Sequence, residues 1–460
     1  MAEILLSHGY FMCFDAAEQK QMRPYPPLGL LYLSAWLKRQ GKSVEVFDST
    51  FSTPAELIRS MEERRPRVLG LYCNLLTRPR IVELIGQAKA RSIPVVVGGP
   101  DASGNADEYL KHGAVAVVRG EGEVTLTELL ERWTEIEPPA GVPGTSVMRD
   151  GEIHHAPDRV LLPSLANHPW PDREAIAIEP YLSAWRARHG YGSVSIITAR
   201  GCPYTCKWCS RAVYGESHRR RPVQDVVEEI AHIKATYAPE RLWFVDDVFT
   251  IHKGWTMEFA NLIESRGLAT PFECISRAER IDDDVADALV RLKCFRVWIG
   301  SESGSQRILD AMDRRVRVET VQRATRLLRS RGIAVGFFIM VGYLGEEIED
   351  LEATVRHIRE SRPDVVLTTT AYPIHGTDYA RDLNGSTVNP KSWELGSDRE
   401  TVVRGRRTSR FYDAARRWIE NDAEASRLRS DGKRLASVQP AIRAGLARLK
   451  MRLHEGERVV

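Results

Sequence analysis

Short apolar runs alternate with amphipathic segments along most of the chain. Over the first 135 residues, five such runs predict strands at 4–7, 44–47, 68–72, 94–97 and 115–118. Apolar residues three and four apart predict helices at 28–40, 54–64, 80–91, 106–112 and 125–133. Strands that alternate with helices form a parallel sheet with right-handed crossovers. We therefore expect an α/β domain of flavodoxin-like, Rossmann-like order over residues 1–135.

The alternation stops between residues 136 and 192. Prolines and glycines interrupt every longer element here, and two short runs at 145–148 and 152–155 flank Asp150-Gly151. An Asp-Gly pair between two strands is typical of a hairpin. We expect this segment to be a linker that carries one small hairpin.

The alternation of strands and helices returns over residues 193–380. The expected strands lie at 194–198, 241–245, 271–276, 296–299, 334–340 and 365–370. The expected helices lie at 222–236, 255–266, 285–292, 319–331 and 349–361. Six β/α units predict a partial (β/α)6 barrel, like a TIM barrel left open on one side. Its site should gather at the carboxyl ends of the strands.

The last segment, residues 381–460, is expected to be helical and Arg-rich. One apolar face is formed by Phe411, Ala414, Ala415, Trp418 and Ile419. This pattern predicts a packed helix with a solvated cationic face. The alternative is a cap over the open barrel that meets an anionic substrate.

Composition adds limits to this picture. The 460 residues suffice for two to three domains, and a net charge of +3 favours neither nucleic acid nor membrane as a partner. Seven cysteines, three of them clustered, do not form a disulfide pattern. With no visible signal peptide and no apolar run near the roughly 18 residues of a membrane helix, we expect a cytoplasmic protein.

Three cysteines form the most informative motif of the chain. Cys202, Cys206 and Cys209 follow the strand expected at 194–198. Three thiolates can hold a metal centre and leave one coordination position open, whereas structural zinc sites take four ligands. His218 is the nearest candidate for a fourth ligand. The alternatives are a zinc knuckle and cysteines that hold no metal.

The triad, with Trp208 just before its last cysteine, resembles that of the radical S-adenosylmethionine (SAM) enzymes. The resemblance implies a 4Fe-4S cluster held by the three cysteines, SAM on the fourth iron, and Trp208 near the adenine. For the strand ends it implies the SAM amine at Asp246 and Asp247, the SAM carboxylate at Arg277, the ribose hydroxyls or SAM backbone at Ser301 and Glu302, and the adenine against Val341. The alternative for any one of these residues is a helix cap or a structural hydrogen bond.

Three further side chains follow the last two barrel strands. Tyr343, Tyr372 and His375 are expected to line the substrate cavity as catalytic residues. A histidine carries protons near neutral pH, and a tyrosine hydroxyl can donate a proton or a hydrogen atom. The alternative is a buried aromatic side chain with a hydrogen-bonded polar tip.

The first domain resembles the cobalamin-binding domain that precedes many radical SAM modules. The resemblance rests on Pro24-Tyr25-Pro26-Pro27-Leu28-Gly29-Leu30, Gly98-Gly99-Pro100 and Gly120-Glu121-Gly122-Glu123. Glycine at a strand end lets the backbone come close to a ligand. The implied cofactor-binding residues are Ser49, Gly98, Gly99, Pro100, Gly120, Glu121 and Gly122.

The sequence lacks the D-x-H-x-x-G motif whose histidine ligates cobalt in many cobalamin domains. His8 and His112 lack the accompanying Asp and Gly. The chain thus resembles the branch that binds cobalamin without a histidine ligand, which implies a lower corrin face near Asn74, Leu75 and Leu76. The alternatives are ordinary strand-end packing for these three residues, and a domain that binds another ligand or none.

Together the resemblances imply a cobalamin-dependent radical SAM methyltransferase. It would act on an unactivated carbon or phosphorus through methylcobalamin and a 5′-deoxyadenosyl radical. The implied partners are a small-molecule substrate and an external electron donor such as flavodoxin or ferredoxin, with no nucleic acid and no membrane. The alternatives are oxidative ring formation, as in the anaerobic magnesium-protoporphyrin IX monomethyl ester cyclases, and a non-catalytic cobalamin or redox sensor.

Overall fold

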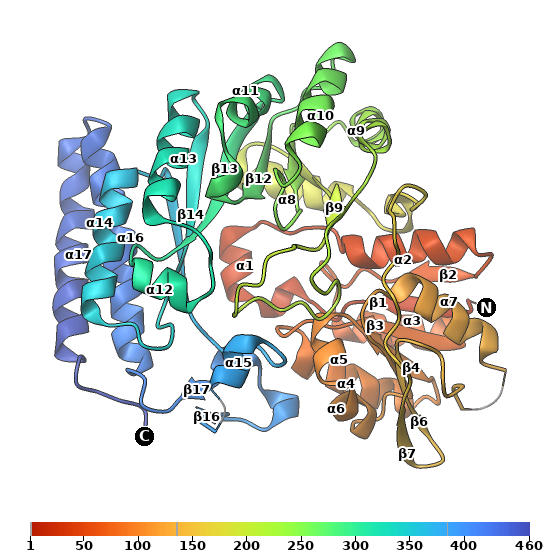
Figure 1. The fold of residues 1–460 in the computed structure, drawn as a ribbon. Helices are drawn as coiled ribbons and strands as arrows, with labels where there is room; N and C mark the ends of the chain where they lie inside the picture. Colours follow the sequence, from red (N-terminus) through yellow and green to blue (C-terminus); the bar gives the residue numbers. More distant parts are fainter. Residues whose placement is uncertain (1, 135–136, 384) are drawn as a thin grey trace.

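The computed structural model describes residues 2–134, 137–383 and 385–460, and it contains two large, mainly parallel sheets (Figure 1). The first sheet begins with β1 (Ile4–Ser7), β2 (Val44–Val46), β3 (Val68–Tyr72), β4 (Val95–Gly98) and β5 (Ala116–Val118). These five strands are parallel in the order β2-β1-β3-β4-β5, which confirms the flavodoxin-like fold. The helices of this part are α1 (Ala16–Gln21), α2 (Leu28–Arg39), α3 (Pro54–Arg64), α4 (Arg78–Lys89), α5 (Pro100–Gly104), α6 (Ala106–Lys111) and α7 (Gly122–Arg132).

The hairpin of the expected linker belongs to this first sheet. It consists of β6 (Thr145–Arg149) and β7 (Glu152–His155), and β6 pairs antiparallel with β5. The sheet therefore has seven strands, and the hairpin covers the edge that β5 would otherwise expose. The domain boundary expected at residues 135 and 136 lies outside the described residues.

The rest of the linker carries α8 (Glu179–His189), which the sequence pattern did not predict. Its buried side chains reach back to the first domain. The Tyr181 hydroxyl donates to Asp48 Oδ2 at 2.7 Å, and Trp185 Nε1 donates to the Pro24 carbonyl at 2.8 Å. The segment is therefore a packed connection between the two sheets.

The second sheet is the expected open barrel. Its strands are β8 (Ser193–Ile196), β11 (Arg241–Phe244), β12 (Phe272–Ser276), β13 (Cys294–Glu302), β14 (Ala334–Val341) and β15 (Val365–Thr370). All six are parallel in chain order, and within the described part of the chain β8 and β15 remain unpaired edges. The helices around it are α9 (Val223–Tyr237), α10 (Lys253–Ser265), α11 (Asp283–Arg291), α12 (Gln306–Ala311), α13 (Val318–Ser330) and α14 (Ile348–Ser361).

Smaller elements complete the description. They are β9 (Ala199–Arg200), β10 (Arg219–Arg220), α15 (Asp378–Asp382), β16 (Thr387–Val388) and β17 (Val402–Val403), with 3-10 helices η1 (Met12–Phe14), η2 (Arg173–Ala175), η3 (Ala278–Arg280), η4 (Trp393–Leu395) and η5 (Asp398–Glu400). In the described residues no helix is long and apolar enough to cross a membrane.

The C-terminal segment forms a helical hairpin of α16 (Ser409–Ser430) and α17 (Arg434–Leu453). It lies against β15 and α14 on the outside of the barrel, at the edge of the molecule farthest from the first sheet (Figure 1). The expected apolar face of α16 is buried. The structure thus confirms the packed helix and not the cap over the barrel.

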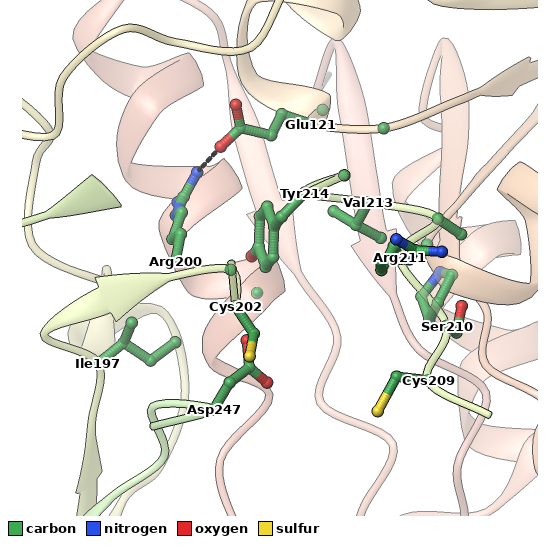
Figure 2. A pocket seen from close by; sticks show the side chains of 18 of the residues that line it. Glu121, Ile197, Arg200, Cys202, Cys209, Ser210, Arg211, Val213, Tyr214 and Asp247 are labelled. Atoms are coloured by element: carbon green, nitrogen blue, oxygen red, sulfur yellow. Dashed lines mark hydrogen bonds and ion pairs between the residues drawn. The ribbon is translucent and has the colours of Figure 1, made fainter. Parts of the chain in front are cut away.

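A buried cluster of charges joins the two domains. Arg200 of β9 donates to Glu121 at 2.9 Å and to Glu123 at 2.6 Å, and Arg219 of β10 donates to Glu121 at 2.7 Å. His168 of the linker lies 3.1 Å from the Glu123 carboxylate. The pair Arg200–Glu121 is visible in Figure 2. A buried charge without its partner is strongly destabilising, so this cluster opposes separation of the domains.

The pKa of Glu123 shows the strength of this cluster. Burial alone would raise the pKa, but the charge of Arg200 and the contact with His168 hold it well below its ordinary value of about 4.5. A carboxylate with a lowered pKa in the folded state stabilises the fold above the ordinary pKa, and this contribution is lost as the pH falls.

We predict that Arg200→Met lowers the free energy of unfolding at pH 7 by about 3 kcal/mol, because Glu123 would keep a buried, unpaired charge. The difference from wild type should narrow as the pH falls below about 4.5. Urea unfolding of both proteins, at pH 7 and at a pH below 4.5, measures the difference in the free energy of unfolding. The control is Arg186→Met, which breaks a half-exposed pair with Glu240 and should lose less than about 1 kcal/mol. A similar loss in both variants would contradict the prediction.

Candidate functional site

One cavity of about 660 Å³ lies between the carboxyl ends of the two sheets. The first domain contributes mainly glycine and apolar side chains, among them Leu30, Leu33, Gly70, Leu71, Tyr72, Gly98, Gly99, Pro100, Gly120 and Gly122. The barrel contributes thiols, charged groups and aromatic rings, among them Cys202, Tyr204, Cys206, Trp208, Cys209, Tyr214, Asp247, Arg277, Glu302, Arg314 and Phe338. Both strand edges therefore face one shared space, which is of the size of a cofactor site.

The cysteine motif lies on a loop that enters this cavity. Gly201 starts the loop with a φ of +82°, and a Cβ there would lie 2.3 Å from the Ser217 carbonyl oxygen, so only glycine fits. The short ladder of β9 and β10 closes the loop at its base, where Arg200 pairs with Arg219. Cys202 and Cys209 point into the same open space (Figure 2), and Cys206 also lines it.

The arrangement of the thiols differs from that of a single-metal site. Among the described residues, no three His, Cys, Asp or Glu side chains are placed to hold one metal ion. In an iron–sulfur cubane each cysteine binds a different iron, so the three thiols need not meet at one point. His218 does not act as a nearby fourth ligand, because it lies outside the cavity lining and its Nδ1 bonds to the Gly201 carbonyl at 3.0 Å. The geometry disfavours a zinc knuckle.

The electrostatic surroundings favour a thiolate at Cys206, whereas burial raises the pKa of Cys202, and the contact with Cys206 together with burial raises that of Cys209. A hydrogen bond with Cys209, aided by the nearby charges of Arg314 and Arg277, lowers the pKa of Cys206 to about 6 although burial opposes this. Arg277 Nη1 lies 3.5 Å from the Cys206 sulfur. Since a thiolate is the form that binds metal, the two guanidiniums prepare the loop for a metal cluster.

Arg277 and Arg314 differ in how many of their side-chain donors have hydrogen-bond partners. Arg277 also donates to Glu279 and to the Arg314 carbonyl, and it stacks on Tyr204 with its Cζ 3.7 Å from the ring centroid. Arg314 donates Nη2 to the Gly300 carbonyl at 2.7 Å. Its buried Nε and Nη1 have no hydrogen-bond partner among the described residues, although Nε lies 3.9 Å from Glu302 Oε1 as an ion pair. A buried guanidinium with an unused donor beside a cavity suits an anionic ligand, so Arg314 is a candidate for such a contact in addition to the expected Arg277.

In each of two pairs of adjacent predicted residues, only the second residue lines the cavity. Asp247 and Glu302 line the cavity, whereas Asp246 and Ser301 are buried outside it. Asp246 accepts hydrogen bonds from the Thr198 and Ala199 amides at 2.6 and 3.1 Å and from Arg220 at 2.9 Å. Ser301 bonds to His357 at 2.9 Å. Contrary to the expectation, these two residues support the strand ends and do not face a ligand.

The two carboxyl groups in the cavity have raised pKa values. Burial, with the neighbouring charge of Asp246, raises the pKa of Asp247. Burial raises the pKa of Glu302 to about 7, although Arg314 counteracts this. Glu302 has a φ of +60° and sits where β13 shifts its register against β14, which turns its side chain inward. Both groups can accept hydrogen bonds from an ammonium or from hydroxyls.

The expected catalytic residues lie outside the cavity lining. Tyr343 is buried and stacks on Tyr379 with ring centroids 4.5 Å apart, Tyr372 is half-buried, and His375 is exposed. Before Tyr343, Gly342 has a φ of +77° and lies against the ring of Tyr412. Val341 is likewise buried in the core, and from the same strand Phe338 lines the cavity. Trp208 lines the cavity as expected.

The strand ends of the first domain also divide into two sets. Gly98, Gly99, Pro100, Gly120, Glu121 and Gly122 all line the cavity. Ser49 is buried beside His8, and Asn74 accepts hydrogen bonds from the Leu76 and Thr77 amides at 2.9 and 3.2 Å. Asn74, Leu75 and Leu76 thus form the turn before α4 and do not line the cavity, whereas Tyr72 at the end of β3 does.

The glycines of this edge make room for a large, flat group. At Gly99 the chain runs so close to the end of β3 that a Cβ would lie 2.4 Å from the Cys73 carbonyl oxygen. Only glycine permits this close approach, which leaves the cavity open. No histidine is among the lining residues that the structure describes. The residues present therefore fit a corrin that has no histidine ligand from this chain.

Sequence reasoning missed the segment that follows the last cysteine. Ser210, Arg211, Ala212, Val213, Tyr214 and Gly215 line the cavity and lie beside the strand ends of the first domain (Figure 2). The guanidinium carbons of Arg200 and Arg219 each lie 5.8 Å from the Tyr214 ring centroid. Because this segment is irregular, no periodic pattern could have predicted its contacts.

Comparison with known proteins agrees with this geometry. The family model of the B12 binding domain matches residues 23–130, and that of the radical SAM superfamily matches residues 196–358. An uncharacterized methyltransferase from Pyrococcus horikoshii is 28% identical over 76% of this chain and 77% of its own. A cytidylyl-2-hydroxyethylphosphonate methyltransferase from Streptomyces wedmorensis is 25% identical over 79% of both. An anaerobic magnesium-protoporphyrin IX monomethyl ester cyclase from Rubrivivax gelatinosus is 25% identical over 74% of this chain and 63% of its own.

Solved structures share the fold. The radical SAM methyltransferase TsrM from Kitasatospora setae superimposes with a TM-score of 0.70, at 20% identity over 85% of this chain and 81% of that one. The cobalamin-dependent radical SAM enzyme OxsB gives 0.74, at 16% identity over 98% and 80%. The chain therefore contains a B12 binding domain followed by a radical SAM domain.

Proposed function

We propose that the chain is a cobalamin-dependent radical SAM methyltransferase that acts on an unactivated carbon or phosphorus of a small molecule. The observation that supports this most is the shared cavity, where the cysteine loop of the barrel faces the glycine edge of the first domain. Relatives named as methyltransferases support the same reaction class. A sensor would not need the charged groups that converge beside the thiols.

In this proposal the two walls of the cavity bind different cofactors. When bound, a 4Fe-4S cluster supplies the electron that cleaves SAM, and cobalamin carries the methyl group. Cys202, Cys206 and Cys209 hold the cluster, and the charges of Arg277 and Arg314 offset that of the thiolates. Gly98, Gly99, Gly120 and their neighbours hold the corrin by close backbone approach.

Arg314, Asp247 and Glu302 are the proposed SAM-binding residues of the barrel. Arg314 Nη1, which has no hydrogen-bond partner among the described residues, binds the carboxylate, and Asp247 and Glu302 accept from the ammonium or the ribose hydroxyls. Trp208 contacts the adenine side, where it packs near Met340 and Tyr343. Tyr204 and Tyr214 are two of the other aromatic groups of the lining, and they orient a substrate between the two cofactors and exclude water.

Two partners complete the proposal. The cluster requires an external one-electron donor such as flavodoxin or ferredoxin, and an oxygen-sensitive cluster suits a reducing, cytoplasmic setting. The substrate remains defined only by class, because the cavity wall is mainly apolar with a few charged groups near the thiols.

The reaction products test the proposal directly. We expect the protein, reconstituted without oxygen with iron, sulfide and hydroxocobalamin and then reduced, to form both 5′-deoxyadenosine and S-adenosylhomocysteine from SAM. Chromatography of the quenched mixture measures both. Formation of 5′-deoxyadenosine alone would contradict methyl transfer and favour the cyclase-type reaction. The control with Cys202, Cys206 and Cys209 changed to Ala should form no 5′-deoxyadenosine and should still retain corrin absorbance.

A second prediction concerns the SAM carboxylate. Arg314→Met should weaken SAM binding to the reconstituted protein by at least about tenfold, because a charge-assisted hydrogen bond is lost. The affinity of Arg314→Lys for SAM should lie between those of wild type and Arg314→Met, since lysine keeps the charge without the planar guanidinium. Equilibrium dialysis with labelled SAM measures the dissociation constant. The control is Arg315→Met, at an exposed neighbour paired with Asp313, which should bind as wild type. Wild-type affinity in Arg314→Met would refute this assignment.

A further inference from the structure

The outer face of α17 exposes a continuous row of large apolar side chains. The apolar stripe consists of Leu435, Val438, Ile442, Leu446, Leu449 and Leu453, whose exposed fractions range from 52% to 91%. The opposite face of the helix packs on α16 through small side chains and Met451. Contiguous exposed apolar patches of this kind mark interaction sites on proteins that lack a membrane span.

The stripe runs straight along the helix. Leu435 and Leu453 are 18 residues apart, which is about five turns at roughly 3.6 residues per turn, so they lie on one line. The partner of a left-handed coiled coil would instead require a repeat of about 3.5 residues, with apolar residues at positions 445 and 452. These positions hold Gly445 and Arg452. The spacing therefore suits a flat surface better than a left-handed coiled coil.

The charged side chains of α17 itself are all of one sign. The helix Arg434–Leu453 contains five basic residues, Arg434, Arg443, Arg448, Lys450 and Arg452, and no acidic residue. Arg448 and Arg452 pair with Glu352 of α14. Arg443 and Lys450 follow one border of the stripe, and neither forms an ion pair within the described part of the chain. Two copies packed stripe to stripe would bring these cations together without an acidic residue of α17 to neutralise them.

We propose that α17 docks on the surface of an anionic lipid bilayer. The apolar stripe would enter the boundary between headgroups and acyl chains, with the helix axis in the plane of the surface. Arg443 and Lys450 can extend their aliphatic stems along the apolar side chains and place their charges at the lipid headgroups. Because α17 lies at the edge of the molecule away from the first sheet (Figure 1), this attachment leaves the cobalamin-binding domain off the membrane.

This inference stands apart from the proposed function, and it differs from the sequence-based expectation of no membrane partner. That expectation rested on a net charge of +3 averaged over 460 residues. The average hides the local concentration of basic and apolar side chains on one exposed helix. The attachment is peripheral and needs no spanning helix.

Vesicle sedimentation of the full-length protein tests the proposal. We expect binding to vesicles of equal parts phosphatidylglycerol and phosphatidylcholine, and much weaker binding to phosphatidylcholine alone. Ile442→Glu/Leu446→Glu should lower the affinity for anionic vesicles at least about tenfold, because two apolar side chains no longer leave water. Arg443→Gln/Lys450→Gln should lower it severalfold, and raised salt should weaken wild-type binding.

A matched control separates the stripe from general surface effects. Val160→Glu/Leu395→Glu introduces the same charge at two exposed apolar positions elsewhere and should bind as wild type. No binding of the wild type to anionic vesicles would overturn the proposal, as would equal losses in the control. Light scattering of the same samples checks self-association. A wild-type dimer that Ile442→Glu/Leu446→Glu dissociates would also overturn it, because the stripe would then bind a second copy.

Discussion

The buried charges of Glu121, Glu123, Arg200 and Arg219 constrain the rest of the structure. In this cluster the first domain contributes the carboxylates and the barrel contributes the guanidiniums. Both sets lose water on folding, so each needs the opposite charges of the other domain. Arg200 stands two residues before Cys202, and Glu121 lies within the glycine loop of the first domain. The same contacts that hold the domains together therefore align the cysteine loop with the glycine edge, and the cavity exists because of this alignment.

Two adjacent pairs at the barrel strand ends divide their roles between scaffold and cavity. Both lie where regular strand geometry ends, since Asp246-Asp247 follows β11 and Glu302 has a φ of +60° at the register shift of β13. In both Asp246-Asp247 and Ser301-Glu302, the first residue is buried in hydrogen bonds to the scaffold and the second faces the cavity. The buried member supports the strand end, so each pair combines support with a ligand-facing group. Asp246 accordingly accepts hydrogen bonds from Thr198, Ala199 and Arg220, and Asp247 lines the cavity.

The sequence predicted the two sheets, the strand order and the cysteine loop because each rests on local patterns. Apolar runs and glycines mark the strands and their ends directly. It could not choose between Asp246 and Asp247, because the choice depends on the register at the strand end. It missed Arg314, which reaches the cavity through the fold from a loop after α12, and it misplaced Tyr343, because the turn at Gly342 depends on packing against Tyr412.

One cavity between the two sheets should receive both cofactors, and electron paramagnetic resonance tests this most directly. In protein that holds a reduced cluster and Co(II) cobalamin, we expect the spectrum of each centre to be broadened or split by the other, since both spins occupy one space of about 660 Å³. With Cys202, Cys206 and Cys209 changed to Ala, the cobalt spectrum should lose this perturbation. Two independent, unperturbed spectra in the fully loaded protein would contradict a shared site.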